Sequence, residues 1–185
     1  MKAKLIFSIL LPSIILFIIS YLLDMKFLTS SPAYLMPLFF GFVLGIFNYK
    51  FYKRKIYFNQ AIQVALISII ISYICFIIAL FSFPLLTKII NLLVENPSKI
   101  FRGEQISDLS LFLSVYLLTP IYVILSFKSI FKYPKSRTTI IIFVITLITF
   151  LLLGYLTYYI DKAYLLWMSI MIFFIELIIH QKEIN

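Results

Sequence analysis

Long runs of apolar residues limit the folds open to this sequence. The stretches LIFSILLPSIILFIISYLL (5–23) and IIIFVITLITFLLLGYLTYYI (140–160) carry no charged residue. Runs of about 20 residues match helices that cross the roughly 30 Å hydrocarbon core of a bilayer, where each backbone polar group needs a partner within its own segment. With 63% hydrophobic and only 12% charged residues, the chain has too little polar surface for a soluble domain. The pattern predicts an all-α membrane protein, and the scarcity of alternating strand patterns disfavours an outer-membrane barrel.

Six runs are long enough to cross the membrane, and no soluble domain separates them. We therefore expect one integral membrane domain over 1–185, a six-transmembrane-helix bundle. The first run has the basic start of a signal peptide, but no A-x-A-like cleavage site follows it, so we expect it to remain as a helix. The predicted spans are 5–23, 32–49, 61–83, 109–127, 138–160 and 163–180.

The basic residues predict which side of the membrane each loop faces. With the N-terminus in the cytoplasm, eleven of the 16 Lys and Arg residues fall in cytoplasmic segments and five fall outside. Cytoplasmic loops carry the excess of Lys and Arg in membrane proteins. This distribution predicts a bacterial-type cytoplasmic (inner) membrane protein with both termini cytoplasmic.

The connection 84–108 is the one long loop, and we expect it outside the cell. Within it, Leu85, Ile89 and Leu92 recur at helical spacing, with Lys88 and Asn91 between them. This pattern predicts an amphipathic helix at the extracytoplasmic surface of the membrane that ends before Pro97, and the alternatives are a re-entrant segment and an extracytoplasmic cap over a cavity.

Two basic clusters flank the predicted cytoplasmic ends of the spans. The net charge of +9 could suggest nucleic-acid binding, but the positive-inside rule explains it. We expect the clusters to contact anionic lipid headgroups, and we expect no nucleic-acid partner. Their members are Lys53, Arg54, Lys55, Lys128, Lys132, Lys135 and Arg137.

Glu176 is the only carboxylate within a predicted span, and His180, the only histidine, lies four residues later. On a helix the two share one face, about 6 Å apart along the axis. Ionisable groups in membrane spans usually face the interior of the bundle. Amides at a similar predicted depth, Asn48, Asn59 and Gln63, would complete a polar cluster at the cytoplasmic mouth of the bundle. It could bind a cation or a solute headgroup or relay protons; alternatively Glu176 pairs with a loop base such as Lys53 and is structural.

Other patterns are less specific. Gly41 and Gly45 have the spacing of close helix–helix contacts, either within the bundle or with another subunit. Glu176 and His180 supply too few ligands for a metal site, so we expect no metal and no cofactor. No span contains Asp, and no hydrolase motif such as G-x-S-x-G or H-E-x-x-H occurs, which disfavours an enzyme.

Six spans in about 180 residues with basic cytoplasmic loops resemble, in outline, the substrate-binding subunits of energy-coupling-factor transporters and the small rod-shape-determining membrane subunits. The first span lacks the run of small alanines by which such substrate subunits dock, so no residue role is transferred. We expect a non-enzymatic membrane subunit of a transport or membrane-assembly complex, with a protein partner or a second copy in the membrane. The alternatives are an oligomeric pore-forming effector and a lipid-modifying enzyme.

Overall fold

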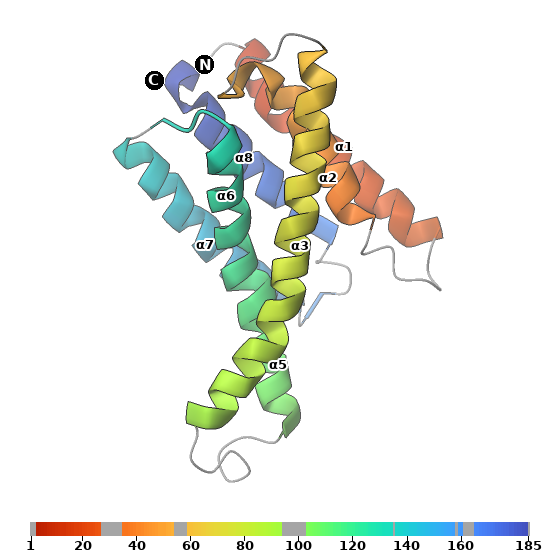
Figure 1. Cartoon of the computed structure of the whole chain (residues 1–185), viewed down its shortest axis with the longest axis vertical. Helices are drawn as coiled ribbons and strands as arrows, with labels where there is room; N and C mark the ends of the chain where they lie inside the picture. Colours follow the sequence, from red (N-terminus) through yellow and green to blue (C-terminus); the bar gives the residue numbers. More distant parts are fainter. Residues whose placement is uncertain are drawn as a thin grey trace.

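The computed structural model describes residues 3–26, 35–53, 59–93, 103–134, 136–157, 159–160 and 165–184. Over these ranges the chain is helical and contains no strand; Tyr52 and Phe131 form one isolated antiparallel bridge. The helices pack side by side in a bundle (Figure 1). In chain order they are α1 (Ala3–Lys26), α2 (Met36–Asn48), η2 (Tyr49–Phe51), α3 (Gln60–Leu93), α5 (Gly103–Leu113), the π turn η3 (Ser114–Leu118), α6 (Thr119–Ile130), α7 (Arg137–Thr157) and α8 (Leu166–Ile184).

Four helical segments in the described ranges are long and apolar enough to cross a membrane: Leu5–Leu23, Gln60–Leu93, Gln105–Ile130 and Arg137–Thr157. They correspond to the first, third, fourth and fifth predicted spans. The second and sixth predicted spans correspond to shorter apolar helices, Met36–Phe51 and Leu166–Gln181. The structure therefore supports an all-α membrane protein with four membrane-length helices, and the count of six spans stays a prediction.

α3 is longer than the third predicted span. Its 34 residues continue through Pro84 to Leu93, so the helix is about 51 Å long. The expected separate interfacial helix beginning at Pro84 is not confirmed, because residues 84–93 belong to α3. The rest of its predicted course, towards Pro97, lies outside the described residues.

α2 packs closely against α3. A Cβ atom added to Gly41 would lie 2.5 Å from Ile69 Cα, and one added to Gly45 would lie 2.4 Å from Ala65 Cα. Both neighbours are backbone atoms, so neither can move aside without shifting α3. The structure therefore uses both glycines for packing within the chain.

The face of α3 that points into the bundle consists of small side chains. Ser68, Ser72 and Cys75 follow one another at intervals of four and three residues, Ser82 follows seven residues later, and all four are buried. Their small size lets α2 and α6 approach α3, while larger residues such as Leu66 and Ile70 lie at the surface. Since the surface of α3 is also apolar, hydrophobicity alone does not distinguish its two faces.

Pro120 explains the π turn between α5 and α6. In this turn the Thr119 N–H bonds to the Ser114 carbonyl, five residues back. In the same register the Val115 carbonyl would accept a bond from residue 120, but proline has no N–H. Instead the indole Nε1 of Trp167 donates to the Val115 carbonyl oxygen at 3.3 Å. A side chain from α8 thus satisfies a backbone acceptor that Pro120 leaves open.

Both termini of the bundle lie at one end, together with the α2–α3 and α6–α7 connections (Figure 1). We call this the basic end; its described residues include Tyr49–Lys53 and Lys128–Tyr133. At the opposite end, the last turns of α3 and the first turns of α5 extend beyond α7 and α8 as a two-helix stem (Figure 1). Contacts of Ser114 with Ala79 and of Tyr116 with Thr157 mark the level at which the stem leaves the bundle.

Candidate functional site

Glu176 lies in the most deeply buried part of the chain. It is 0% exposed, and on α8 the neighbouring Ile172, Ile175 and Ile178 are also 0% exposed. α8 contacts α1, α2 and α7, so the carboxylate faces protein rather than lipid. A buried carboxylate is costly unless polar partners surround it, so its contacts decide what the site can do.

Asn48, the last residue of α2, is the first of these partners. Its Nδ2 donates to Glu176 Oε1 at 2.6 Å and to its own helix at the Leu44 carbonyl at 3.0 Å. Both amide hydrogens are therefore used, which fixes the orientation of the side chain. The Asn48 Oδ1 atom is buried and has no hydrogen-bond partner among the described residues.

His180 lies on the same face of α8, one turn beyond Glu176. Its Nε2 is 3.5 Å from Glu176 Oε2, and its ring packs edge-on against Phe51 with the ring centroids 4.8 Å apart. The histidine side chain is 9% exposed. A buried imidazole beside a carboxylate can share one proton with it, either as a charged pair or as two neutral groups.

Tyr133 comes from the α6–α7 connection at the same end of the bundle. Its hydroxyl is buried and has no hydrogen-bond partner within the described ranges. Burial raises the pKa of Tyr133, and the negative charge of Glu176 raises it further. The hydroxyl therefore stays protonated at physiological pH and can donate a hydrogen bond to a ligand that enters the cluster.

Two paired connections lie at the basic end beside this polar cluster. The Lys53 N–H donates to the Ile130 carbonyl at 3.0 Å, and the Lys132 N–H donates to the Phe51 carbonyl at 2.9 Å. Phe51, in one connection, packs against His180, and Tyr133, in the other, lies near enough to Glu176 for the carboxylate to raise the tyrosine's pKa. The loop pairing thus positions residues of the cluster.

Asn59 and Gln63 do not join the buried cluster. Both lie at exposed positions at the start of α3, whereas Glu176 is fully buried. Asn59 adopts a left-handed backbone conformation with φ 42°, and its carbonyl accepts the first bonds of α3 from Ile62 and Gln63. Asparagine tolerates this conformation better than most residues, so its role here is to start the helix. Of the five predicted residues, the structure brings together Asn48, Glu176 and His180.

Sequence reasoning missed Tyr133 and a second polar group beside α8. Thr139 Oγ1 donates to Gln181 Oε1 at 2.8 Å, and the Gln181 amide donates to Ser136 Oγ. Gln181 is 3% exposed, so this group fastens the end of α8 to the start of α7. The only sequence signal was that Gln181 follows His180 at the end of an apolar run.

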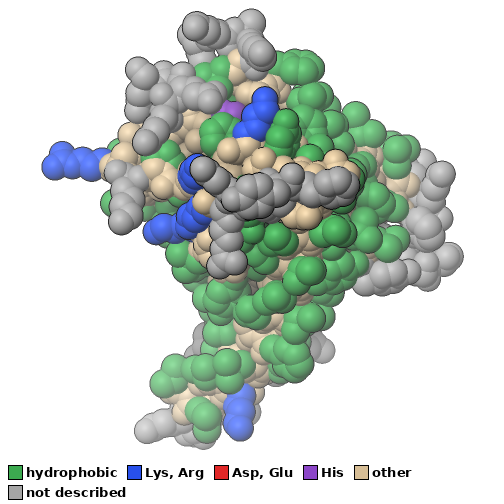
Figure 2. Space-filling model, turned by 45° about the horizontal axis from the view of Figure 1, so that its top comes forward, with side chains coloured by type: hydrophobic (Ala, Val, Ile, Leu, Met, Phe, Trp, Pro, Cys, Tyr) green, Lys and Arg blue, Asp and Glu red, His purple; other side chains and the backbone are tan. Residues whose placement is uncertain are grey.

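Four of the seven basic residues predicted to contact lipid are described by the structure, and they lie around this end. Figure 2 shows Lys and Arg side chains here over a largely apolar surface. The Lys53 ammonium donates to the Lys128 and Ser129 carbonyls, so it is occupied at the loop pair rather than at Glu176. Lys53, Lys128, Lys132 and Arg137 are exposed, whereas Arg54, Lys55 and Lys135 lie outside the described residues.

The described residues contain no group of three or more His, Cys, Asp or Glu that could hold a metal ion. The chemistry of the cluster is that of one carboxylate, one imidazole and two neutral oxygen-bearing side chains. Such a set can hold a proton, a water molecule or a monovalent cation. No protein-family model, curated protein or solved structure matches this sequence.

Proposed function

We propose that this chain is a membrane subunit of a transport or membrane-assembly complex, in which Glu176 and His180 bind a proton or a monovalent cation. The observation that carries the proposal is the complete burial of Glu176 with Asn48 on one carboxylate oxygen and His180 facing the other. Ionisable groups buried in membrane helices commonly mark ion paths and proton relays.

Unused hydrogen-bonding capacity in the cluster supports a ligand there. Asn48 Oδ1 and Tyr133 Oη are buried without a hydrogen-bond partner in the described part of the chain, and Glu176 Oε2 has only the 3.5 Å contact with His180 Nε2. Structural polar clusters in protein interiors are normally satisfied, since an unpaired buried group costs about 1–3 kcal/mol. Oxygens of this kind are the donors that a small cation or a water molecule uses.

The membrane orientation belongs to the same proposal. We place the chain in the cytoplasmic (inner) membrane with the basic end and both termini on the cytoplasmic side, because Lys and Arg concentrate at that end. α2 and α8 then complete six crossings within the bundle. The exposed lysines at this end contact anionic lipid headgroups, and the site needs no cofactor and no nucleic acid.

The alternative of an oligomeric pore loses its specific support. That hypothesis used Gly41 and Gly45 as a contact between subunits, but both glycines pack on α3 of the same chain. A lipid-modifying enzyme would need a nucleophile or an acid–base pair open to substrate, whereas His180 and Glu176 are both buried. A proton or cation site requires neither feature.

Infrared spectroscopy of the purified protein in nanodiscs tests whether Glu176 binds a proton. We expect acid-minus-alkaline difference spectra to contain the band of a buried carboxyl group, and Glu176→Gln to remove it while the protein stays folded. Asp108→Asn is the matched control, because it removes an exposed carboxylate on α5. Thermal unfolding in sodium, potassium or choline salts tests whether the site binds a small cation. Tyr133→Phe should weaken the stabilisation by that cation.

Each result bears on the proposal. A pH-dependent band or a cation-dependent stabilisation that disappears in Glu176→Gln but not in Asp108→Asn supports it. If Glu176→Gln leaves both the spectrum and the response to cations unchanged, Glu176 is structural and the proposal is wrong.

A further inference from the structure

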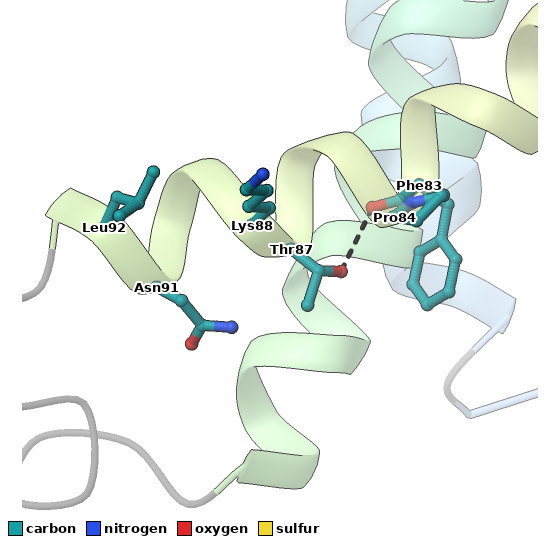
Figure 3. Close-up of a pocket in the computed structure, with 6 residues that line it drawn as sticks. All are labelled: Phe83, Pro84, Thr87, Lys88, Asn91 and Leu92. Atoms are coloured by element: carbon teal, nitrogen blue, oxygen red, sulfur yellow. Dashed lines mark hydrogen bonds between the residues drawn. The ribbon is translucent and has the colours of Figure 1, made fainter.

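A shallow, open hollow, which we call the groove, lies on the stem, far from Glu176. It has a volume of about 430 Å³ and is lined by Phe83, Pro84, Thr87, Lys88, Asn91 and Leu92. All six residues come from α3, and Figure 3 shows Lys88 and Leu92 on one side of its ribbon and Thr87 and Asn91 on the other. The groove thus combines a cationic and two neutral polar groups with apolar walls.

Pro84 lies near the start of the segment of α3 that lines the groove. Proline has no N–H for the carbonyl four residues back, and its ring crowds the preceding turn. Thr87 Oγ1 donates to the Phe83 carbonyl at 3.0 Å, which supports the backbone next to the proline (Figure 3). In Figure 1 the last turns of α3 lean away from the axis of its upper part.

The length of α3 predicts how far the groove lies from the basic end, and therefore its position across the membrane. Gln60 bonds to the Tyr49 carbonyl at the basic end, so α3 starts at that boundary of the bundle. Lys88 lies 28 residues later, which is about 42 Å along a helix. A bilayer is about 40–45 Å thick with its headgroups, so Lys88 reaches the headgroup layer of the opposite leaflet.

The stem exposes more apolar surface than is usual for a segment surrounded by water. Leu85, Leu92 and Leu93 are 59%, 74% and 77% exposed, and Leu111 on α5 is 51% exposed. The groove itself has one charged group, Lys88, and its lining contains no carboxylate. Its occupant must therefore offer apolar groups and an anion at the depth of the headgroups.

We propose that the groove binds an anionic phospholipid of the leaflet opposite the basic end. The lipid phosphate contacts the Lys88 ammonium and the Asn91 amide, and an acyl chain covers Leu92 and Phe83. Lysine can meet both needs because its apolar stem lies along the groove while its ammonium reaches the phosphate. This assignment does not depend on the proton or cation site at Glu176.

A photoactivatable phosphatidylglycerol in nanodiscs tests the assignment, with peptide mass spectrometry to locate the labelled residues. We expect labelling within 83–93, reduced about fivefold in Lys88→Gln, since one lysine near an anionic surface contributes on that scale. Lys88→Arg should restore labelling. Lys128→Gln makes the same change at the basic end and should leave labelling of 83–93 unaffected.

Competition identifies the ligand. Unlabelled phosphatidylglycerol should suppress labelling of the groove, while phosphatidylcholine and inorganic phosphate should not. Equal labelling by a phosphatidylcholine analogue, suppression by inorganic phosphate, or unchanged labelling in Lys88→Gln would overturn the assignment. Labelling of 5–23, which faces lipid on α1, serves as the internal reference in each case.

Discussion

The Asn48 side chain donates to Glu176 Oε1 at 2.6 Å, although the two residues are 128 positions apart in the chain. The bond joins the end of α2 to the centre of α8, so it ties a short helix to the core of the bundle. Asn48 also bonds to the Leu44 carbonyl, which leaves its amide no rotational freedom. The position of the carboxylate therefore depends on where α2 ends.

Asn48→Asp should make stability depend on pH. At low pH one of the two carboxyl groups is protonated and can donate to the other, so the contact survives. As the pH rises that proton is lost, and two negative charges meet in a buried site. We expect the melting temperature of the variant to fall from about pH 5 to pH 9 much more than that of the native protein. Equal pH profiles would show that the two side chains are not in contact.

The glycine contact between α2 and α3 should be sensitive to one methyl group. Gly45→Ala places a Cβ 2.4 Å from Ala65 Cα, and the helices must separate to relieve the clash. We expect a loss of about 1–3 kcal/mol in unfolding free energy, the usual cost of overpacking. Gly154→Ala is the comparison, because its new Cβ meets the side chains of Phe112 and Tyr116 rather than backbone. A larger loss in Gly154→Ala would contradict the assigned packing.

Trp167→Phe should leave the Val115 carbonyl without its donor. The expected cost is about 1–3 kcal/mol, the range for an unsatisfied buried acceptor. Pro120→Ala supplies a backbone N–H near that carbonyl, so it should reduce the cost of Trp167→Phe. Thermal unfolding of the two single variants and the double variant forms a double-mutant cycle, which gives the coupling free energy between the two positions. If the two losses in unfolding free energy simply add, Trp167 does not compensate for the N–H that Pro120 lacks.

Cysteine labelling tests the orientation in the membrane. In a Cys75→Ser background, we expect a membrane-impermeant maleimide to label Asn91→Cys in intact cells. Lys132→Cys should react only after the cells are permeabilised, because it lies at the basic end. Both parent residues are exposed, so access to the reagent depends on the side of the membrane. The reverse pattern would invert the proposed topology.

The helical class and much of the site follow from local sequence. Long apolar runs require helices, and the spacing of Glu176 and His180 places them on one face whatever surrounds α8. Asn48 was expected at the right depth, because depth follows from counting residues along a span.

The predictions that the structure does not support are those for which a residue's depth along a span does not determine where its side chain points. Gln63 has the predicted depth, but the small residues of α3 turn inward and leave Gln63 at the surface. An all-apolar helix has no polar face to reveal this rotation. The third predicted span ended at Phe83, yet α3 continues through Pro84, because membrane helices tolerate proline where neighbouring groups support the backbone. Tyr133 lies on a connection, where no helical periodicity predicts its position.

The close fit of α2 on α3 also has a consequence for biosynthesis. α2 and the η2 turn that continues it cover Met36–Phe51, which is about 25 Å long and shorter than a 30 Å hydrocarbon layer. α2 leaves the ribosome before α3, the helix that covers Gly41 and Gly45. We therefore expect α2 to remain at the membrane-insertion machinery until α3 has been synthesised, so that the two helices enter the bilayer together as a hairpin.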